Sequence, residues 1–251
     1  MRILGIDTAI PAASVALIED GKLVAEEIHT NAGQSLDGKA SQTRGNHAEI
    51  VLPLIQAILT RANVVATDLS GIAVSIGPGS FTGLRIGLAT VKGIAYECGL
   101  PLVGVSTLHA NAARVTGFDG MICSLLDARK SEVYFALFHH DGHNLKRLTE
   151  DAIASLDSAL DRVRSCYRAN GSSVFFIGDG ASAYDKILIH VFGSAAQMMA
   201  GNDYPSVAAQ VAALAEGRFR AHMTDNLALL VPVYLRPSEA ETKRRQLALT
   251  C

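Results

Sequence analysis

A glycine-rich segment holds the residues of this sequence best suited to binding chemistry. Residues 77–85 read Gly-Pro-Gly-Ser-Phe-Thr-Gly-Leu-Arg. They follow an apolar run typical of a strand and open a stretch typical of a helix, so their backbone N–H groups would point to an edge where anions bind. No Gly-Lys-Ser/Thr follows, so this is not a Walker A loop. We expect a nucleotide or phosphate site formed by Gly77, Gly79, Ser80, Thr82 and Gly83.

Close helix packing is the alternative explanation for these glycines. Gly83, Gly87 and Gly93 recur along the same expected helix, and a missing side chain lets a helix approach a sheet or another helix. Asp7 also has two explanations. Its carboxylate follows the first expected strand and could join the nucleotide site, or it could accept hydrogen bonds from hairpin N–H groups. Both pairs of alternatives stay open at this point.

The spacing of cysteines and histidines does not indicate a metal centre. The four cysteines form no Cys-x-x-Cys pair, and no His-Glu-x-x-His motif occurs. Three histidines lie within residues 139–143, but they straddle an expected Asp-Gly hairpin turn, where alternate side chains diverge. We expect reduced thiols and no metal.

Composition restricts the class of protein. Of 251 residues, 49% are hydrophobic and 18% charged, which is typical of a folded globular chain. The formal net charge of −2 gives no overall positive field, so we do not expect tight nucleic-acid binding by the chain alone. Asp7 interrupts the first apolar run and no charge-free span is long enough to cross a membrane. We expect a cytoplasmic protein without a membrane segment.

Hydrophobic periodicity predicts alternating strands and helices. A cap at Asn46 with Glu49 favours a helix start there, and Pro53 predicts a kink or a later start. The expected strands are 2–7, 14–19, 22–29, 71–76, 102–105, 121–126, 132–139 and 173–177, and the expected helices are 46–63, 82–98, 152–166, 184–192 and 206–219.

The second half of the sequence begins like the first. A strand, an aspartate, a second strand and an Asp-Gly turn occur in this order in both halves, at nearly equal spacing. This repetition predicts a duplicated α/β fold. We expect one subdomain at 1–105, a second at 106–235 whose helix near 206–219 packs back on the first, and a charged tail at 236–251. Lys243, Arg244 and Arg245 in this tail either contact RNA phosphate or are solvated.

Two helices of the first subdomain are the expected partner surface. The helix at 46–63 is apolar nearly all the way round, so it needs burial on two sides. The glycine-rich helix at 82–98 would permit close approach, and two such helices from each partner would form a four-helix contact. The expected interface residues are Ile50, Val51, Leu54, Ile58, Gly83, Arg85, Gly87 and Thr90.

These motifs, in this order, resemble the TsaB (YeaZ) family. The similar segments are residues 1–9, 14–17, 77–87, 104–108, 127–129, 132–134 and 232–236. The loop at 33–45 looks longer than the family's usual turn, and the tail after residue 236 differs. The resemblance implies an actin/hexokinase/Hsp70-like (ASKHA) α/β fold of two similar subdomains, each with a mixed sheet and flanking helices.

The resemblance also implies a role in forming N6-threonylcarbamoyladenosine on the tRNA adenosine beside the anticodon. There, TsaD transfers the threonylcarbamoyl group from threonylcarbamoyl-AMP, TsaB pairs with TsaD, and the ATPase TsaE joins them. TsaB is then a scaffold with no catalytic residue and no cofactor of its own, and ATP or ADP binds at the interface of the complex. It reaches tRNA through the complex, and it forms a homodimer when TsaD is absent. TsaD carries a His-x-x-x-His metal pair where this sequence has Thr107 and Asn111.

Two enzymatic alternatives remain at this stage. The same fold serves ATP-dependent small-molecule kinases, in which Asp7 and the glycine segment would handle ATP. A metalloenzyme resembling a glycoprotease is the other alternative, and the replacement of the metal pair by Thr107 and Asn111 argues against it. ATP turnover by the isolated chain would favour the kinase, and a stoichiometric bound metal would favour the metalloenzyme.

Overall fold

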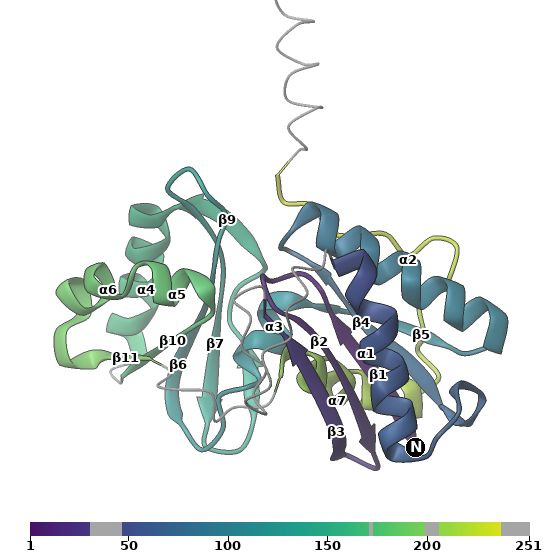
Figure 1. The fold of residues 1–251 in the computed structure, drawn as a ribbon. Helices are drawn as coiled ribbons and strands as arrows, with labels where there is room; N and C mark the ends of the chain where they lie inside the picture. The colour runs from purple at the N-terminus through teal and green to yellow at the C-terminus, as the bar shows by residue number, and fades with distance from the viewer. Residues whose placement is uncertain (31–46, 171–172, 199–205, 237–251) are drawn as a thin grey trace, which may run out of the picture.

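The first half of the molecule is built on a five-stranded sheet, shown with the rest of the computed structural model in Figure 1. Residues 1–30, 47–170, 173–198 and 206–236 are described. β1 pairs antiparallel with β2 and parallel with β4. The strands are β1 (Arg2–Asp7), β2 (Ala13–Glu19), β3 (Lys22–His29), β4 (Gly71–Gly77) and β5 (Leu102–Ser106), in the order β3-β2-β1-β4-β5.

The second sheet repeats this topology. Its strand order, β8-β7-β6-β10-β11, matches that of the first sheet, with an antiparallel β6–β7 pair and a parallel β6–β10 pair at its centre. The expected duplicated, ASKHA-type α/β fold is therefore confirmed, and Asp7 and Asp127 end equivalent strands. The strands are β6 (Asp119–Asp127), β7 (Glu132–Asp141), β8 (Leu145–Arg147), β10 (Val174–Ile177) and β11 (Ala196–Met198), with β9 (Ala152–Ser155) paired to β7.

Helices cover both faces of the first sheet. α1 (His47–Ala62) and α2 (Phe81–Cys98) bury an apolar core on one face, and a 3₁₀ turn, η1 (Ala66–Asp68), connects α1 to β4. α7 (Val207–Arg220), far along the chain, packs on the opposite face against β1, β2, β4 and β5 (Figure 1). Its approach is close, because a Cβ on Gly5 would lie 2.1 Å from the Ala208 carbonyl oxygen.

One short helix lies between the halves. α3 (Thr107–Ala112) contacts α7 and β4 on one side and β6 and β7 on the other. The second sheet also packs on α4 (Leu156–Asn170), α5 (Asp179–Ala183) and α6 (Asp185–Phe192), followed by the 3₁₀ turn η2 (Gly193–Ala195). No helix in the described ranges is both long and apolar enough to cross a membrane.

Several element predictions need correction. Residues 152–155 form strand β9, because their backbone pairs antiparallel with β7, and α4 starts only at Leu156. The helix expected at 184–192 is α6, and the short helix α5 that precedes it was not expected. Pro53 does not delay the start of α1, which begins at His47. The Asn46 cap, the 33–45 loop and the tail from 237 lie outside the described residues, and the subdomain boundaries at 105 and 235 stay predictions.

The segment after α7, here called the strap (residues 221–236), runs back across the first sheet. Asp225 accepts a hydrogen bond from Gly104 N at 2.7 Å and forms an ion pair with Arg218 at 2.9 Å. Farther along, Val233 N donates to the Ile76 carbonyl at 2.7 Å. These contacts bring the strap to the end of β4, beside the glycine segment.

Candidate functional site

A cleft of about 930 Å³ lies between the two halves at the ends of β1, β4 and β6. Of the residues expected to bind nucleotide, Gly79, Ser80 and Thr82 line it. Asp7, Gly77 and Gly83 are not among the lining residues. Arg85, expected at a partner interface, also lines the cleft. The structure thus places only three of the six residues expected to bind nucleotide at the cleft.

Close packing accounts for the glycines of this segment. A Cβ on Gly83 would lie 2.0 Å from the Thr8 carbonyl oxygen, and one on Gly79 would lie 2.3 Å from that of Ala9. A Cβ on Gly87 would lie 2.2 Å from the Thr8 hydroxyl. Gly93 has open space around it. Ser80 caps α2 by accepting a hydrogen bond from Gly83 N at 3.2 Å.

Asp7 is sealed beneath the cleft. It is fully buried, and its Oδ2 atom has no hydrogen-bond partner in the described chain. Burial raises the pKa of this carboxyl from 3.8 to about 6, although the Ser75 hydroxyl, the Ala9 N–H and the Arg114 charge oppose the rise. Ala9 N donates to Asp7 Oδ1 at 3.4 Å, a weak version of the turn contact expected from the sequence.

The second half contributes a turn and two carboxylates to the cleft. Asp179 Oδ1 accepts a hydrogen bond from Asp127 N at 3.2 Å, and burial raises the pKa of Asp179 above its usual value. Asp127 Oδ1 accepts from Arg129 N at 2.8 Å. Arg129, Lys130 and Ser131 all have positive φ (61°, 56° and 59°), which is uncommon for non-glycine residues.

The strap forms the rim of the cleft, and no local sequence pattern predicted this. Arg85 Nε donates to Tyr234 Oη at 2.9 Å, and its guanidinium lies 3.9 Å from the centre of the Phe81 ring. The Phe81 and Tyr234 rings are 4.7 Å apart. Arg236 then reaches the second half, donating to the Ala128 carbonyl at 2.8 Å and pairing with Glu132. The strap therefore connects both halves across the cleft.

Thr107 begins α3 and Asn111 lies near its end, and both side chains are buried. Asn111 Nδ2 donates to Ser124 Oγ at 3.2 Å, and Arg114 donates to Asn111 Oδ1, also at 3.2 Å. Thr107 Oγ1 is buried without a hydrogen-bond partner in the described chain. An arginine beside the amide oxygen would repel a bound cation, so these side chains do not fit a metal pair.

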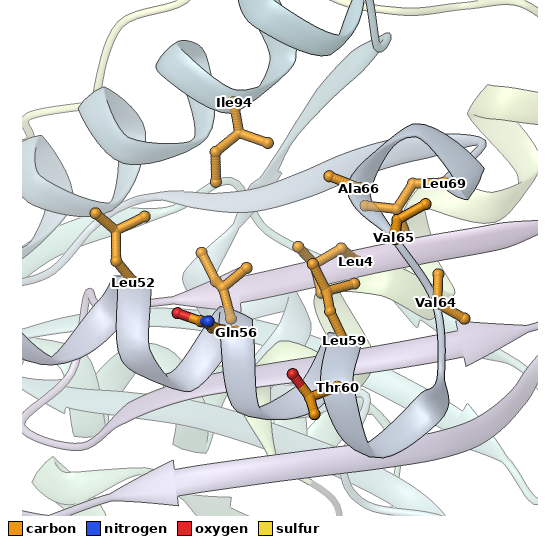
Figure 2. A pocket seen from close by; sticks show the side chains of 11 residues that line it. Leu4, Leu52, Gln56, Leu59, Thr60, Val64, Val65, Ala66, Leu69 and Ile94 are labelled. Atoms are coloured by element: carbon orange, nitrogen blue, oxygen red, sulfur yellow. The ribbon is translucent and has the colours of Figure 1, made fainter.

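A second hollow, here called the α1–α2 groove, lies on the outer face of the first half. Its volume is about 470 Å³. Figure 2 shows Leu52 and Leu59 of α1 pointing toward the space that Ile94 of α2 enters from the opposite side. Residues around η1, among them Val65, close one end (Figure 2). Leu52 and Val65 are 54% and 60% exposed, so the groove is an open apolar surface.

The residues expected at a partner interface divide into two groups. Ile50, Val51 and Ile58 are covered by the chain's own core, and Gly83 and Gly87 pack against Thr8. Arg85 is exposed, whereas Leu54 and Thr90 are partly exposed. The expected interface stays a prediction. Of its three reachable residues, Arg85 lines the cleft, and none lines the α1–α2 groove.

The architecture defines the class of this protein: a two-lobed α/β molecule of ASKHA type with a cleft between its lobes. The family model "TsaD: tRNA N6-adenosine threonylcarbamoyltransferase" matches residues 40–244. A Bacillus subtilis protein named tRNA threonylcarbamoyladenosine biosynthesis protein TsaB is 29% identical over 97% of each chain. The Escherichia coli protein of the same name is 39% identical over 58% of each.

A crystal structure supports the fold. It is of a Pseudomonas aeruginosa protein described as similar to the peptidase YeaZ, and it superposes with a TM-score of 0.73 at 24% identity. The superposition covers 94% of this chain and 99% of the other. The chain belongs to the TsaD family and, within it, to the TsaB (YeaZ) group.

Proposed function

We propose that this chain is a non-catalytic partner of a TsaD-type transferase in the formation of N6-threonylcarbamoyladenosine on tRNA. The names of the TsaB relatives support the pathway, and the length of the alignment with the B. subtilis protein supports a whole-chain role. In this proposal TsaE joins the assembly, the chain has no cofactor of its own, and ATP or ADP binds on the surface shared with the partner.

The arrangement of Thr107 and Asn111 on α3 carries the non-catalytic part of the proposal. The positions of the TsaD metal pair hold a buried hydroxyl and a buried amide that is hydrogen-bonded to Arg114. Neither side chain is a strong ligand for iron or zinc, and the arginine charge disfavours a cation. Among the described residues, no group of three or more His, Cys, Asp or Glu side chains is placed to hold a metal.

The α1–α2 groove is the proposed surface for the transferase. It is apolar, open and flanked by two long helices, so a partner helix could bury Leu52 and Val65 together. A second copy of the chain would cover the same surface when the transferase is absent, which gives the homodimer.

Native mass spectrometry of the chain, alone and mixed with TsaD from the same organism, tests this proposal. We expect a metal-free homodimer that converts to a one-to-one heterodimer, and tRNA modification that requires both proteins. A chain that ignores TsaD would overturn the partner role. ATP turnover by the isolated chain, or a stoichiometric metal, would overturn the non-catalytic role in favour of an enzyme.

The groove itself is tested by Leu52→Arg. Because Leu52 is 54% exposed, an arginine there should leave the monomer folded while placing a charge in the apolar contact. We expect the affinity for TsaD to fall at least about tenfold, as for a truncated or charged hot-spot residue, measured by titration calorimetry. Ile189→Arg on α6 is a matched control, since Ile189 is 51% exposed on the other half. Equal affinities of the two variants would place the interface elsewhere.

A further inference from the structure

Arginines and aromatic residues gather in the cleft between the halves. Three arginines and three aromatic residues line it: Arg85, Arg129, Arg236, Phe81, Tyr134 and Tyr234. Asp127 and Asp179 are its acidic residues, and Glu132 nearby is already paired with Arg236. Three arginines against two aspartates give the lining a formal charge of +1, and Glu132 offsets this through its ion pair with Arg236. Its volume of about 930 Å³ is near the upper end of the range for ligand pockets.

A preformed platform of three planar side chains lies on one side of the cleft. Phe81 and Tyr234 are inclined by 31° with their centres 4.7 Å apart, and the Arg85 guanidinium is 3.9 Å from the Phe81 centre. The hydrogen bond from Arg85 to Tyr234 fixes this geometry, so little side-chain entropy remains to be lost on binding. Tyr234 is 39% exposed. Aromatic rings and guanidinium planes in such stacks are the usual platforms for unpaired bases.

Two further cations line the cleft: Arg129 belongs to the second half, and Arg236 ends the strap that reaches it. Arg236 is held in place by the Ala128 carbonyl and Glu132. The Arg129 side chain has no partner among the described residues, although its backbone is tied to Asp127. The positive φ of Arg129 and its two successors is a strained backbone, which the hydrogen bonds of the turn maintain. An arginine whose side chain is unpaired in the described part of the chain and whose backbone turn is fixed by hydrogen bonds suits a phosphodiester.

We propose that this cleft binds a single-stranded segment of RNA, with an unpaired base on the Phe81–Tyr234–Arg85 platform and phosphate groups beside Arg129 and Arg236. The identification of RNA as the strand rests on the proposed function. The net charge of the chain keeps this binding weak in isolation, so the cleft acts as an added RNA contact within the assembled complex. The cleft thus helps to position the RNA substrate and takes no part in the transfer of the threonylcarbamoyl group.

The test measures anisotropy of a fluorescein-labelled RNA hairpin with an unpaired, adenosine-containing loop, across a KCl series. The samples are the chain alone at low salt and the chain with TsaD. Arg129→Gln should weaken binding about 3- to 10-fold and lower the slope of log affinity against log salt by about 0.7, the value for one phosphate contact of a single strand. Phe81→Leu should weaken binding about fivefold or more with an unchanged slope, since it removes only stacking.

The control is Arg164→Gln on α4, an arginine 45% exposed and far from the cleft lining, which should change neither affinity nor slope. Wild-type affinity and slope for Arg129→Gln would overturn the proposal, as would AMP binding in the cleft as tightly as the hairpin. Native mass spectrometry of the same samples separates the two hypotheses. If the wild-type chain forms no complex with TsaD, the proposed function is wrong. If the complex forms but Arg129→Gln and Phe81→Leu both bind RNA as the wild type does, only the RNA site is wrong.

Discussion

At the scale of single residues, Asp7 shows how an expected site residue becomes a structural one. Its place at the end of β1 suggested contact with a nucleotide, but the side chain is enclosed between the sheet and the elements that cover it. A carboxylate in such a place is destabilised as an anion. The raised pKa of Asp7 therefore means that ionising this carboxyl lowers the free energy of unfolding, by an amount that depends on pH.

Replacing Asp7 by asparagine should stabilise the protein at neutral pH. The folded pKa of about 6 lies above the unfolded value of 3.8, so the folded state binds more protons between these values. Stability from this group therefore falls as pH rises from about 4 to 6, and then stays constant. We expect Asp7→Asn to raise the free energy of unfolding by about 1–3 kcal/mol at pH 7.5 and by little at pH 4, measured by urea denaturation.

Asp20→Asn serves as the comparison for this experiment. Its carboxylate is exposed, and the N-terminal ammonium beside it holds the pKa below the usual value, so the substitution should give no gain at pH 7.5. A stabilisation by Asp7→Asn that is the same at pH 4 and pH 7.5 would disprove the ionisation argument.

At the scale of elements, α2 bears on both explanations of the glycine segment, which are anion binding and close helix packing. Its N-terminus lines the cleft, while its glycines at 83 and 87 let it approach the β1–β2 connection. The Thr8 hydroxyl donates to the Gly83 carbonyl at 2.8 Å across this contact. The packing explanation therefore accounts for these two positions.

Paired alanine substitutions along α2 test that account. Gly83→Ala would place a Cβ 2.0 Å from the Thr8 carbonyl oxygen, so it should lower the free energy of unfolding by about 1–3 kcal/mol or more. Gly93→Ala meets nothing within 4 Å and should raise it by about 0.5–1 kcal/mol through helix propensity. Thermal and urea denaturation of both variants would measure this. A Gly83→Ala protein as stable as Gly93→Ala would refute close packing.

The same elements show what the sequence could predict. Local signals sufficed for the β2–β3 hairpin, whose Asp20 and Gly21 carry the positive φ of an Asp-Gly turn, and for the end of α2 at Gly99. They did not suffice for the strap, since Tyr234 meets Arg85 across 149 residues of sequence. Strand β9 was missed because four residues are too short to separate strand from helix by periodicity.

At the scale of the whole molecule, the two halves are connected by α7, α3 and the strap. α7 comes late in the sequence yet fills the inner face of the first sheet, with Val207, Val211 and Phe219 packed on Ile3 and Val103. α3 contacts both sheets, and the strap spans the cleft from Tyr234 to Arg236. The first subdomain is thus completed by residues from the end of the chain.

A fragment of residues 1–105 should therefore fail to fold alone. Without α7 it would expose the apolar face formed by Ile3, Ala73 and Val103, a patch prone to association. We expect it to elute as aggregates in size-exclusion chromatography and to lack a cooperative thermal transition. Co-expression with residues 106–251 should restore a folded, monodisperse complex. A monomeric 1–105 fragment that melts cooperatively would contradict the shared core.

The late position of α7 also has a consequence for how the protein is made. A ribosome delivers β1 to β5 first, whereas the helix that covers their inner face begins only at Val207. Until α7 has been synthesised, the nascent first lobe therefore presents an uncovered apolar surface. A chain interrupted before α7 would keep that surface exposed and would be prone to associate with other chains.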